Sequence, residues 1–527
     1  MTDAATLATL TDALRRGAGR RELLRYLGAG GMGAVAAAGL LGQAGTALAQ
    51  GAPRRGGAIR VATQSASTAD TLDPTRGTNT TDYARAFMFY NGLTRLDAKL
   101  VALPELAESF DTKDAKTWTF KLRRGVKFAD GSALTPADVV FTINRVKDPA
   151  TGSSGRALAT QITEVAADGP DAVRFVLTAA NADLPVILGT PQFMIVKEGT
   201  TDFSKGNGTG PYRVKEFTPG VRSIAVRNPD YWKDGRPYLD QVEYFSIQDE
   251  TARVNAMLAG DIHVASQIGP RVLRRVRSTP GFAVMETKSG NYNDFILRQD
   301  ADPTRNPDLV LAIKHLFDRE QMVNALGGVV ANDHPINPDH RYFNAELKQR
   351  PYDPERAKFH FQKSGLGNTA LPLYVMGTNT MVDQGVILQQ SALGIGMNID
   401  LQRMPNDGYW TNVWMKRPFS GGNINPRPSA DSLFTLFFQS DAPWNESAWK
   451  NERFDQLLLE ARGQTDEAKR KAMYGEMQQL ISDKGGICIP QFSSFFDGHT
   501  AKVKGLSPIP TGGMMGFGFA ENVWLDE

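Results

Sequence analysis

Hydrophobic and polar positions alternate along residues 118–122, WTFKL, with a period of two. This pattern predicts a β-strand with one buried face. Val126 and Phe128 continue the same period, and the Asp-Gly pair at 130–131 predicts a turn after them. We therefore expect a half-buried strand that is followed by a turn in this region of the chain.

Other segments carry helix signals. A threonine cap, a proline and an acid at 135–138, TPAD, predict a helix start. Asp249 is expected to cap a helix that ends at Gly260, and residues 353–355, DPE, to open one that stops near Gly365. A buried helical stripe late in the chain is predicted at Met473, Met477, Leu480 and Ile481. Strands and helices thus alternate irregularly, which indicates an α/β protein, and 527 residues are too many for one compact core.

The first 49 residues differ from the rest. A basic stretch at 20–25, RRELLR, precedes a glycine- and alanine-rich apolar run at 27–41, and ALA follows at 47–49. These are the three parts of a secretory signal, and the paired arginines resemble the twin-arginine type. A membrane anchor is the alternative, but the run is shorter than the ~20 apolar residues that span a bilayer. We expect a signal peptide at 1–49 and a soluble periplasmic protein.

The charge balance follows from this division. Of 59 basic and 57 acidic residues, five arginines and three acids lie in the first 49, so the remainder holds 54 of each. A chain without net positive charge gives no reason to expect a nucleic-acid partner. The single cysteine, Cys488, excludes an intrachain disulfide, lies far from the signal, and is expected to be a small core residue.

A glycine cluster at 206–211, GNGTGP, raises the question of a phosphate site. It lacks the last glycine of the dinucleotide fingerprint and the Gly-Lys-Ser/Thr of a P-loop. Pro211 has no N–H to offer a phosphate, and residues 212–215, YRVK, are typical of a strand. We interpret the cluster as a backbone turn between lobes.

Catalytic motifs are missing as well. The sequence contains no G-x-S-x-G elbow and no H-E-x-x-H zinc motif. His334 and His340, the only close histidine pair, have a spacing that does not suit a metal site. We expect no metal, no cofactor and no enzymatic activity.

Several segments together resemble the signature of the family-5 solute-binding proteins, the extracellular receptors of peptide/nickel-type ABC importers. They follow family order from about residue 57 to 505. The segments are 93–97 (LTRLD), 104–110 (PELAESF), 118–128 (WTFKLRRGVKF), 135–141 (TPADVVF), 208–212 (GTGPY), 227–232 (RNPDYW) and 352–358 (YDPERAK).

The resemblance implies a two-lobed periplasmic binding protein fold with an extra inserted subdomain. Residues 57–89, 207–300 and 488–527 would form the base subdomain of lobe 1, residues 90–206 the inserted subdomain, and residues 301–487 lobe 2. It also implies closure of a cleft around a short peptide or other small polar solute, which a monomeric receptor then delivers to ABC permease subunits.

The resemblance also points to site residues. Peptide receptors of the family commonly place an aspartate in a W-x-x-D-Y-x-D-P tract against the amine of the ligand, but residues 420–431 read SGGNINPRPSAD. This stretch looks like a subgroup with W-S-G-R-P-x-x-D, so Arg427 could bind a carboxylate and Asp431 an ammonium, with Asn425 beside them. An internal Arg427–Asp431 ion pair is the alternative. Tyr292 is a further candidate for the cleft wall, although a core position is equally compatible.

Other functions remain open from the sequence alone. An exported hydrolase could use carboxylates of the cleft, and a receptor of the same class could take nickel chelates, opines or sugars instead of peptides. A chaperone-like role in holding extended chains is the third alternative.

Overall fold

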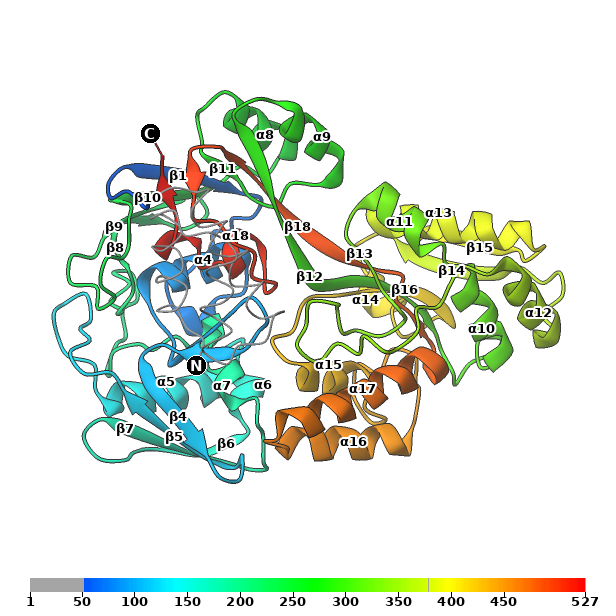
Figure 1. Ribbon diagram of the computed structural model, residues 1–527, viewed down its shortest axis with the longest axis horizontal. Helices are drawn as coiled ribbons and strands as arrows, with labels where there is room; N and C mark the ends of the chain where they lie inside the picture. Colours follow the sequence, from blue (N-terminus) through cyan, green and yellow to red (C-terminus); the bar gives the residue numbers. More distant parts are fainter. Residues whose placement is uncertain (1–51, 378, 527) are drawn as a thin grey trace, which may run out of the picture.

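Two lobes joined by a pair of long strands make up the described chain (Figure 1). The computed structural model describes residues 52–377 and 379–526. The predicted signal peptide, residues 1–49, lies outside the described residues. The two-lobed α/β fold expected from the sequence is confirmed.

The base of lobe 1 is a sheet in the order β11-β1-β10-β9-β8, covered by helices. The C-terminal segment returns to this base, where Phe519 and Val523 join its hydrophobic core. The strands are β1 (Ala58–Thr63), β8 (Tyr212–Thr218), β9 (Arg222–Arg227), β10 (Gln241–Ser246), β11 (Val264–Ala265), β19 (Val503–Lys504) and β20 (Trp524–Leu525). The helices are α4 (Thr80–Phe89), α8 (Glu250–Leu258), α9 (Pro270–Ser278) and α18 (Gly513–Gly516), with the short 3-10 helices η1 (Pro74–Arg76) and η4 (Phe519–Glu521).

A second part of lobe 1 has its own antiparallel sheet, β4-β5-β7-β6, and its own core around Phe120 and Phe175. The strands are β2 (Thr94–Leu96), β3 (Ala102–Pro104), β4 (Ala107–Thr112), β5 (Thr117–Leu122), β6 (Ile162–Ala167) and β7 (Ala172–Leu177). The helices are α5 (Pro136–Lys147), α6 (Arg156–Ala159) and α7 (Leu184–Ile187), with η2 (Pro149–Thr151) and η3 (Pro191–Phe193). We call this part the inserted subdomain; its predicted limits, 90 and 206, and those of the other subdomains stay predictions.

Lobe 2 contains most of the long helices, and its buried apolar side chains form two hydrophobic clusters. Its strands are β13 (Val329–Val330), β14 (Leu371–Met376), β15 (Ile399–Met404), β16 (Phe419–Ile424) and β17 (Ile487–Cys488). Its helices are α10 (Pro307–Leu316), α11 (Arg319–Leu326), α12 (Pro354–Ser364), α13 (Asn379–Gly394), α14 (Tyr409–Asn412), α15 (Ala430–Phe437), α16 (Glu452–Gly463) and α17 (Glu467–Lys484).

Strands β12 (Phe282–Leu297) and β18 (Gln491–Thr500) connect the lobes as an antiparallel pair (Figure 1). The first half of β12 pairs with β18 beside lobe 1, and its second half also pairs with β16 and β17 of lobe 2. The register shifts between Lys288 and Asn291. A shift of this kind bends a strand locally, so the chain changes direction where it passes between the lobes.

Most of the strands and helix caps predicted from local sequence patterns are present in the structure. Trp118, Phe120 and Leu122 are the buried face of β5. The capping box formed at the start of α5, and Asp249 and Asp353 accept N–H bonds as caps of α8 and α12. The expected continuation of the strand to Val126 and Phe128 is wrong: β5 ends at Leu122, and these two side chains are buried from a turn closed by the bond from the Phe128 N–H to the Ser132 carbonyl.

The glycine cluster is a backbone device, as predicted, but the expected position between the lobes is wrong: it lies within lobe 1, against the end of α4. Strand β8 begins directly after it, at Tyr212, and the Gly210 N–H donates to the carbonyl of Phe89 at the end of α4. A Cβ on Gly210 would lie 2.4 Å from the backbone carbon of Phe89. Only glycine lets the two backbones approach this closely.

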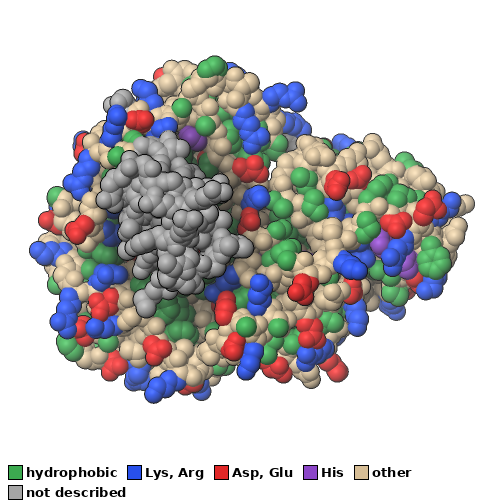
Figure 2. Space-filling view, in the orientation of Figure 1, with side chains coloured by type: hydrophobic (Ala, Val, Ile, Leu, Met, Phe, Trp, Pro, Cys, Tyr) green, Lys and Arg blue, Asp and Glu red, His purple; other side chains and the backbone are tan. Residues whose placement is uncertain are grey.

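Charged side chains of both signs are interspersed over the visible, described part of the surface in Figure 2. Among the described residues, no helix combines the length and the apolar character that crossing a membrane requires. Cys488 is fully buried in β17, which confirms it as a core residue.

The close approach at Gly210 predicts that Gly210→Ala lowers the free energy of unfolding by about 1–3 kcal/mol, because backbone atoms must shift. Gly394→Ala is the matched control. It ends α13 with open space where a Cβ would go, and it should leave stability unchanged or slightly raised. Chemical denaturation of both variants measures the difference, and equal stability of the two would contradict the argument.

Candidate ligand site between the lobes

A small cavity lies where the two lobes face each other beside the crossing strands. Leu100 and Pro510 line it from lobe 1, Gly290 from β12, and a larger group of residues from lobe 2. The lobe 2 residues are Pro335, Ile336, Asn337, His340, Pro426, Arg427 and Leu433. Its volume of about 10 Å³ holds at most one water molecule, so a larger ligand enters here only if the lobes separate.

Arg427 is the charged side chain of this cavity. Its Nη1 donates to the carbonyls of Asn425 at 3.2 Å and Pro426 at 3.4 Å, and its guanidinium lies 5.8 Å from the centre of the Phe437 ring. Within the described residues it forms no ion pair. Burial lowers the pKa of Arg427, but a guanidinium stays charged in proteins. A half-buried charge without a counterion is suited to an anionic group from outside.

Tyr83 of α4, in lobe 1, lies near enough to Arg427 to be affected by its charge. Burial raises the pKa of Tyr83, and the positive charge of Arg427 acts in the opposite direction. The ring of Tyr83 packs against Phe517 with 5.5 Å between centroids. The guanidinium of lobe 2 and the aromatic side chain of lobe 1 thus interact electrostatically across the boundary between the lobes.

Asn425 and Tyr292 lie near Arg427 in different surroundings. Asn425 is exposed, and its Oδ1 accepts a bond of 3.3 Å from Asn291, just after the register shift of β12. Tyr292 is fully buried and packs edge-on against Phe492 in the core of lobe 2. Burial raises the pKa of Tyr292, and its hydroxyl has no hydrogen-bond partner among the described residues. The structure thus places its ring in the core; its role as a ligand contact stays a prediction.

Asp431 is held away from Arg427. It lies in the first turn of α15 and accepts from Nε of Arg462 on α16 at 3.0 Å. Burial raises the pKa of Asp431 to about 6, against the pull of Arg462. The ion pair considered from the sequence, Arg427 with Asp431, does not form, because each side chain has other partners.

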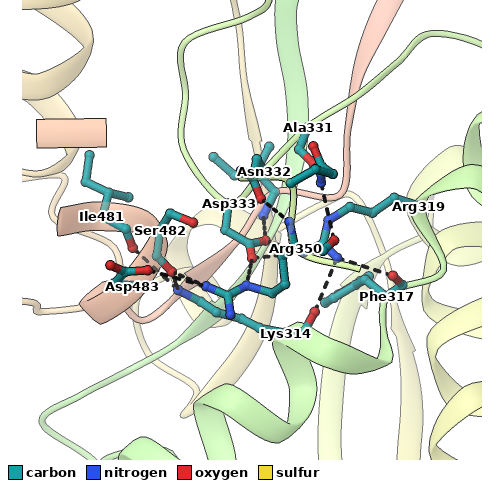
Figure 3. A network of polar contacts seen from close by, with 12 residues as sticks. Lys314, Phe317, Arg319, Ala331, Asn332, Asp333, Arg350, Ile481, Ser482 and Asp483 are labelled. Carbon is teal, nitrogen blue, oxygen red and sulfur yellow. Dashed lines mark hydrogen bonds and ion pairs between the residues drawn. The ribbon is translucent and has the colours of Figure 1, made fainter. Parts of the chain in front are cut away.

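The cavity loop of lobe 2, residues 331–350, is anchored by a buried charge cluster (Figure 3). Both oxygens of Asp333 lie 2.8 Å from Nη2 of Arg319, and Nε of Arg350 lies 3.1 Å from Oδ2. Lys314 donates to the Ser482 carbonyl at 2.8 Å. Burial alone would raise the pKa of Asp333, but the surrounding cations hold it below its usual value. This cluster fixes the loop that carries Asn337 and His340.

A second buried group consists of two carboxyl groups without a cation. Asp294 of β12 and Glu446 are both inaccessible, and Nε1 of Trp414 donates to Glu446 at 2.6 Å. Burial raises the pKa of Asp294 to about 7 and that of Glu446 well above its usual value. The pair is sealed in lobe 2, where no substrate reaches it, so it gives the hydrolase alternative no support.

The two close histidines are neutral structural acceptors. Nδ1 of His334 accepts from the Ile336 N–H at 3.4 Å, and Nδ1 of His340 accepts from the Tyr342 N–H at 3.1 Å. Burial lowers the pKa of both to about 4. Across residues 52–377 and 379–526, no group of three His, Cys, Asp or Glu side chains is arranged to hold a metal ion.

Of the residues singled out in the sequence, Arg427 lines the cavity and Asn425 lies two positions before it, whereas Tyr83, Asn337 and His340 were not expected near the site. No local pattern distinguishes Tyr83 from other aromatic residues of a helix. Asn337 and His340 were seen only as parts of a histidine pair, since their approach to the cleft depends on the anchored loop.

Two lobes, two crossing strands and a charged site between them define the class of two-lobed substrate-binding proteins. The chain belongs to the bacterial extracellular solute-binding proteins, family 5, whose model matches residues 102–445, more than half of its length. Proteins of this family are extracellular or periplasmic, bind peptides or other small ligands, and work with ABC permeases.

Relatives of known name agree with this assignment. Di/tripeptide-binding protein 2 of Pseudomonas aeruginosa is 26% identical over 89% of this chain and 96% of its own. The glutathione-binding protein GsiB of Escherichia coli strain K12 is 25% identical over 78% of this chain and 84% of its own. The structure of DppA from Helicobacter pylori in complex with the peptide STSA superposes with a TM-score of 0.72 at 22% identity, covering 90% of this chain and 99% of that one.

The Asp333 cluster predicts that Asp333→Ala lowers the free energy of unfolding by about 3–5 kcal/mol, because Arg319 and Arg350 lose their buried counterion. Asp171→Ala is the matched control. It breaks an exposed pair with Arg124 in lobe 1 and should have a much smaller effect. Urea denaturation gives both values. A mild effect of Asp333→Ala would mean that water reaches the cluster.

The carboxyl pair predicts a pH dependence. Because the pKa of Asp294 in the folded protein is raised to about 7, its contribution to stability is present at acidic pH and is lost as the pH rises through about 7. Asp294→Asn should reduce this loss and make the variant more stable than the parent at pH 8, by about 1–3 kcal/mol. Unfolding free energies between pH 5 and 8 measure the effect, with Asp171→Asn as control. Parallel curves for parent and Asp294→Asn would show that the carboxyl does not titrate in this range.

Proposed function

We propose that this protein is the receptor of an ABC importer for short peptides or similar small solutes that carry a carboxylate. One observation carries this proposal: Arg427 lines the interlobe cavity, half-buried and without an ion pair among the described residues. Arginine recognises carboxylates with two parallel hydrogen bonds. The ligand would enter between separated lobes and favour their closure by contacting both.

The named ligands of the relatives support this chemistry. Peptides and glutathione each carry at least one free carboxylate, and relatives that bind them are similar to this chain over most of its length. We propose Arg427 as the carboxylate anchor and Asn425 as a polar neighbour. Tyr292 supports the anchor from the core, and Asp431, paired with Arg462, holds the start of α15 beside it.

We also propose that the protein is exported and that its signal segment is then removed. The first 49 residues have the features of a twin-arginine signal, so the protein acts in the periplasm after removal of this segment. The mature receptor acts as a monomer, with residues 90–206 as the inserted subdomain, 301–487 as lobe 2 and the remaining segments as the base of lobe 1. It releases its ligand unchanged. Light scattering of the purified protein tests the monomer, and the N-terminal sequence of the exported protein tests the cleavage site.

The central prediction is that Arg427→Ala raises the Kd for a bound tripeptide at least about tenfold, equivalent to about 1.4 kcal/mol, because the carboxylate loses its counterion. Arg427→Lys should restore only part of the affinity, since lysine lacks the planar fork. Arg124→Ala, an exposed arginine of lobe 1, is the control. Isothermal titration calorimetry with di- and tripeptides gives the values.

Each outcome identifies a different error. Peptide binding that Arg427→Ala leaves unchanged would refute the anchor but not the function. No response to peptides, with binding of a nickel–histidine chelate, an opine or a sugar, would keep the class and change the ligand. Native mass spectrometry of the protein as purified detects a retained ligand, and a cleaved product in place of the added peptide would instead establish a hydrolase.

A further inference from the structure

The lobes also touch at a place separate from the crossing strands. Asp183, just before α7 at the tip of the inserted subdomain, is buried against lobe 2. Its Oδ1 lies 2.7 Å from Nη1 of Arg470 on α17 and 3.5 Å from Nη2 of Arg341. An acid of lobe 1 is therefore enclosed by two arginines of lobe 2.

Lobe 2 holds Arg470 in place without help from lobe 1. Its Nε donates to the Ala461 carbonyl at 3.0 Å, and its other nitrogens donate to the hydroxyls of Tyr342 at 3.0 Å and Tyr474 at 3.2 Å. A guanidinium fixed by three bonds loses little freedom when a carboxylate arrives. Bonds within lobe 2 thus hold the Arg470 side chain in the position where it pairs with the Asp183 carboxylate.

The backbone around Asp183 takes part in the same contact. The Ala182 N–H donates to the Arg462 carbonyl of α16 at 2.8 Å. A Cβ on Gly463 would lie 3.1 Å from Cβ of Ala180, so the tip and the end of α16 are in close contact. Burial alone would raise the pKa of Asp183, but Arg470 and then Arg341 outweigh it and hold the pKa below its usual value.

This contact lies on the far side of the interlobe space from the crossing strands. Figure 1 shows the inserted subdomain beside the ends of α16 and α17, below β12 and β18. The cavity lies between the two connections, since Gly290 lines it from β12 and His340, the neighbour of Arg341, lines it from lobe 2. Separation of the lobes at this side opens the way to Arg427.

We propose that Asp183 and Arg470 form a latch that closes the two lobes without a ligand and thereby sets the rate at which ligand enters and leaves. The latch rests on the proposed function for its role but not for its existence. It stabilises the closed form in both the free and the occupied protein, so ligand entry waits for the latch to open. Loss of the latch then speeds both association and dissociation.

The main variant is Asp183→Asn, which removes the charge and keeps the size of the side chain. Hydrogen exchange of the peptide that contains Ala182 reports directly on the interlobe bond to Arg462. In the protein without added ligand, we expect exchange at this amide to become at least about tenfold faster, with a larger radius of gyration by small-angle X-ray scattering. Asp171→Asn in the same subdomain, whose exposed pair with Arg124 lies within lobe 1, should change neither value.

A second variant tests the packing of Gly463 against Ala180 separately from the ion pair. Gly463→Leu leaves Asp183 and Arg470 intact but places a bulky side chain against Ala180, so it should also open the lobes. Opening by Gly463→Leu together with unchanged exchange in Asp183→Asn would show that packing, not the ion pair, holds the lobes, and would overturn the latch. Unchanged exchange in both variants would overturn it as well.

The rates of ligand association and dissociation test whether the latch controls ligand exchange. With trialanine as the probe in stopped-flow tryptophan fluorescence, both rate constants should rise severalfold in Asp183→Asn. Faster exchange with unchanged rate constants would overturn the proposed role in ligand entry. If the parent protein binds no trialanine, the proposed ligand class fails, while hydrogen exchange and scattering still decide whether the latch exists.

Discussion

Antiparallel pairing between β12 and β18 joins the two lobes and sets the position of the space between them. These strands carry a continuous sheet from β8 in lobe 1 to β15 in lobe 2, so their hydrogen bonds keep the two lobes beside each other. The pairing is interrupted between Lys288 and Asn291, where the ladder shifts its register. A strand bends most easily where its ladder is broken, so relative motion of the lobes is expected to concentrate there. The cavity borders the same segment, through Gly290.

The buried aspartates that hold segments of lobe 2 in place have counterions, whereas the arginine at the candidate site has none. Asp333 pairs with Arg319 and Arg350, and Asp431 pairs with Arg462. These ion pairs fix the segments that carry the two aspartates. At the site, Arg427 makes hydrogen bonds to backbone carbonyls only. Since buried charges in a folded protein are normally paired, the unpaired guanidinium is the reason for proposing that an anionic group of the ligand binds there.

The latch and the ligand act on one equilibrium from two positions. The crossing strands fix one side of the interlobe space, Asp183 and Arg470 close the other, and Arg427 lies between them. A ligand shifts such an equilibrium only by its differential affinity for the closed form. A contact within the protein that also favours closure lowers what the ligand must contribute, and it slows exchange in both directions. Selectivity and exchange rate can thus be set by separate residues.

Features that depend on neighbours along the chain could be predicted from the amino-acid sequence. The period of β5 follows from side-chain periodicity, and the caps at Asp249 and Asp353 follow from local hydrogen bonds. The order of the family segments also gave the two-lobed fold. The pairing of Asp431 with Arg462 and the position of the Tyr292 ring in the core could not be predicted from local sequence. These outcomes depend on how strands and helices distant in the sequence pack, because a charge or a ring takes whichever partner the assembled lobes bring within reach.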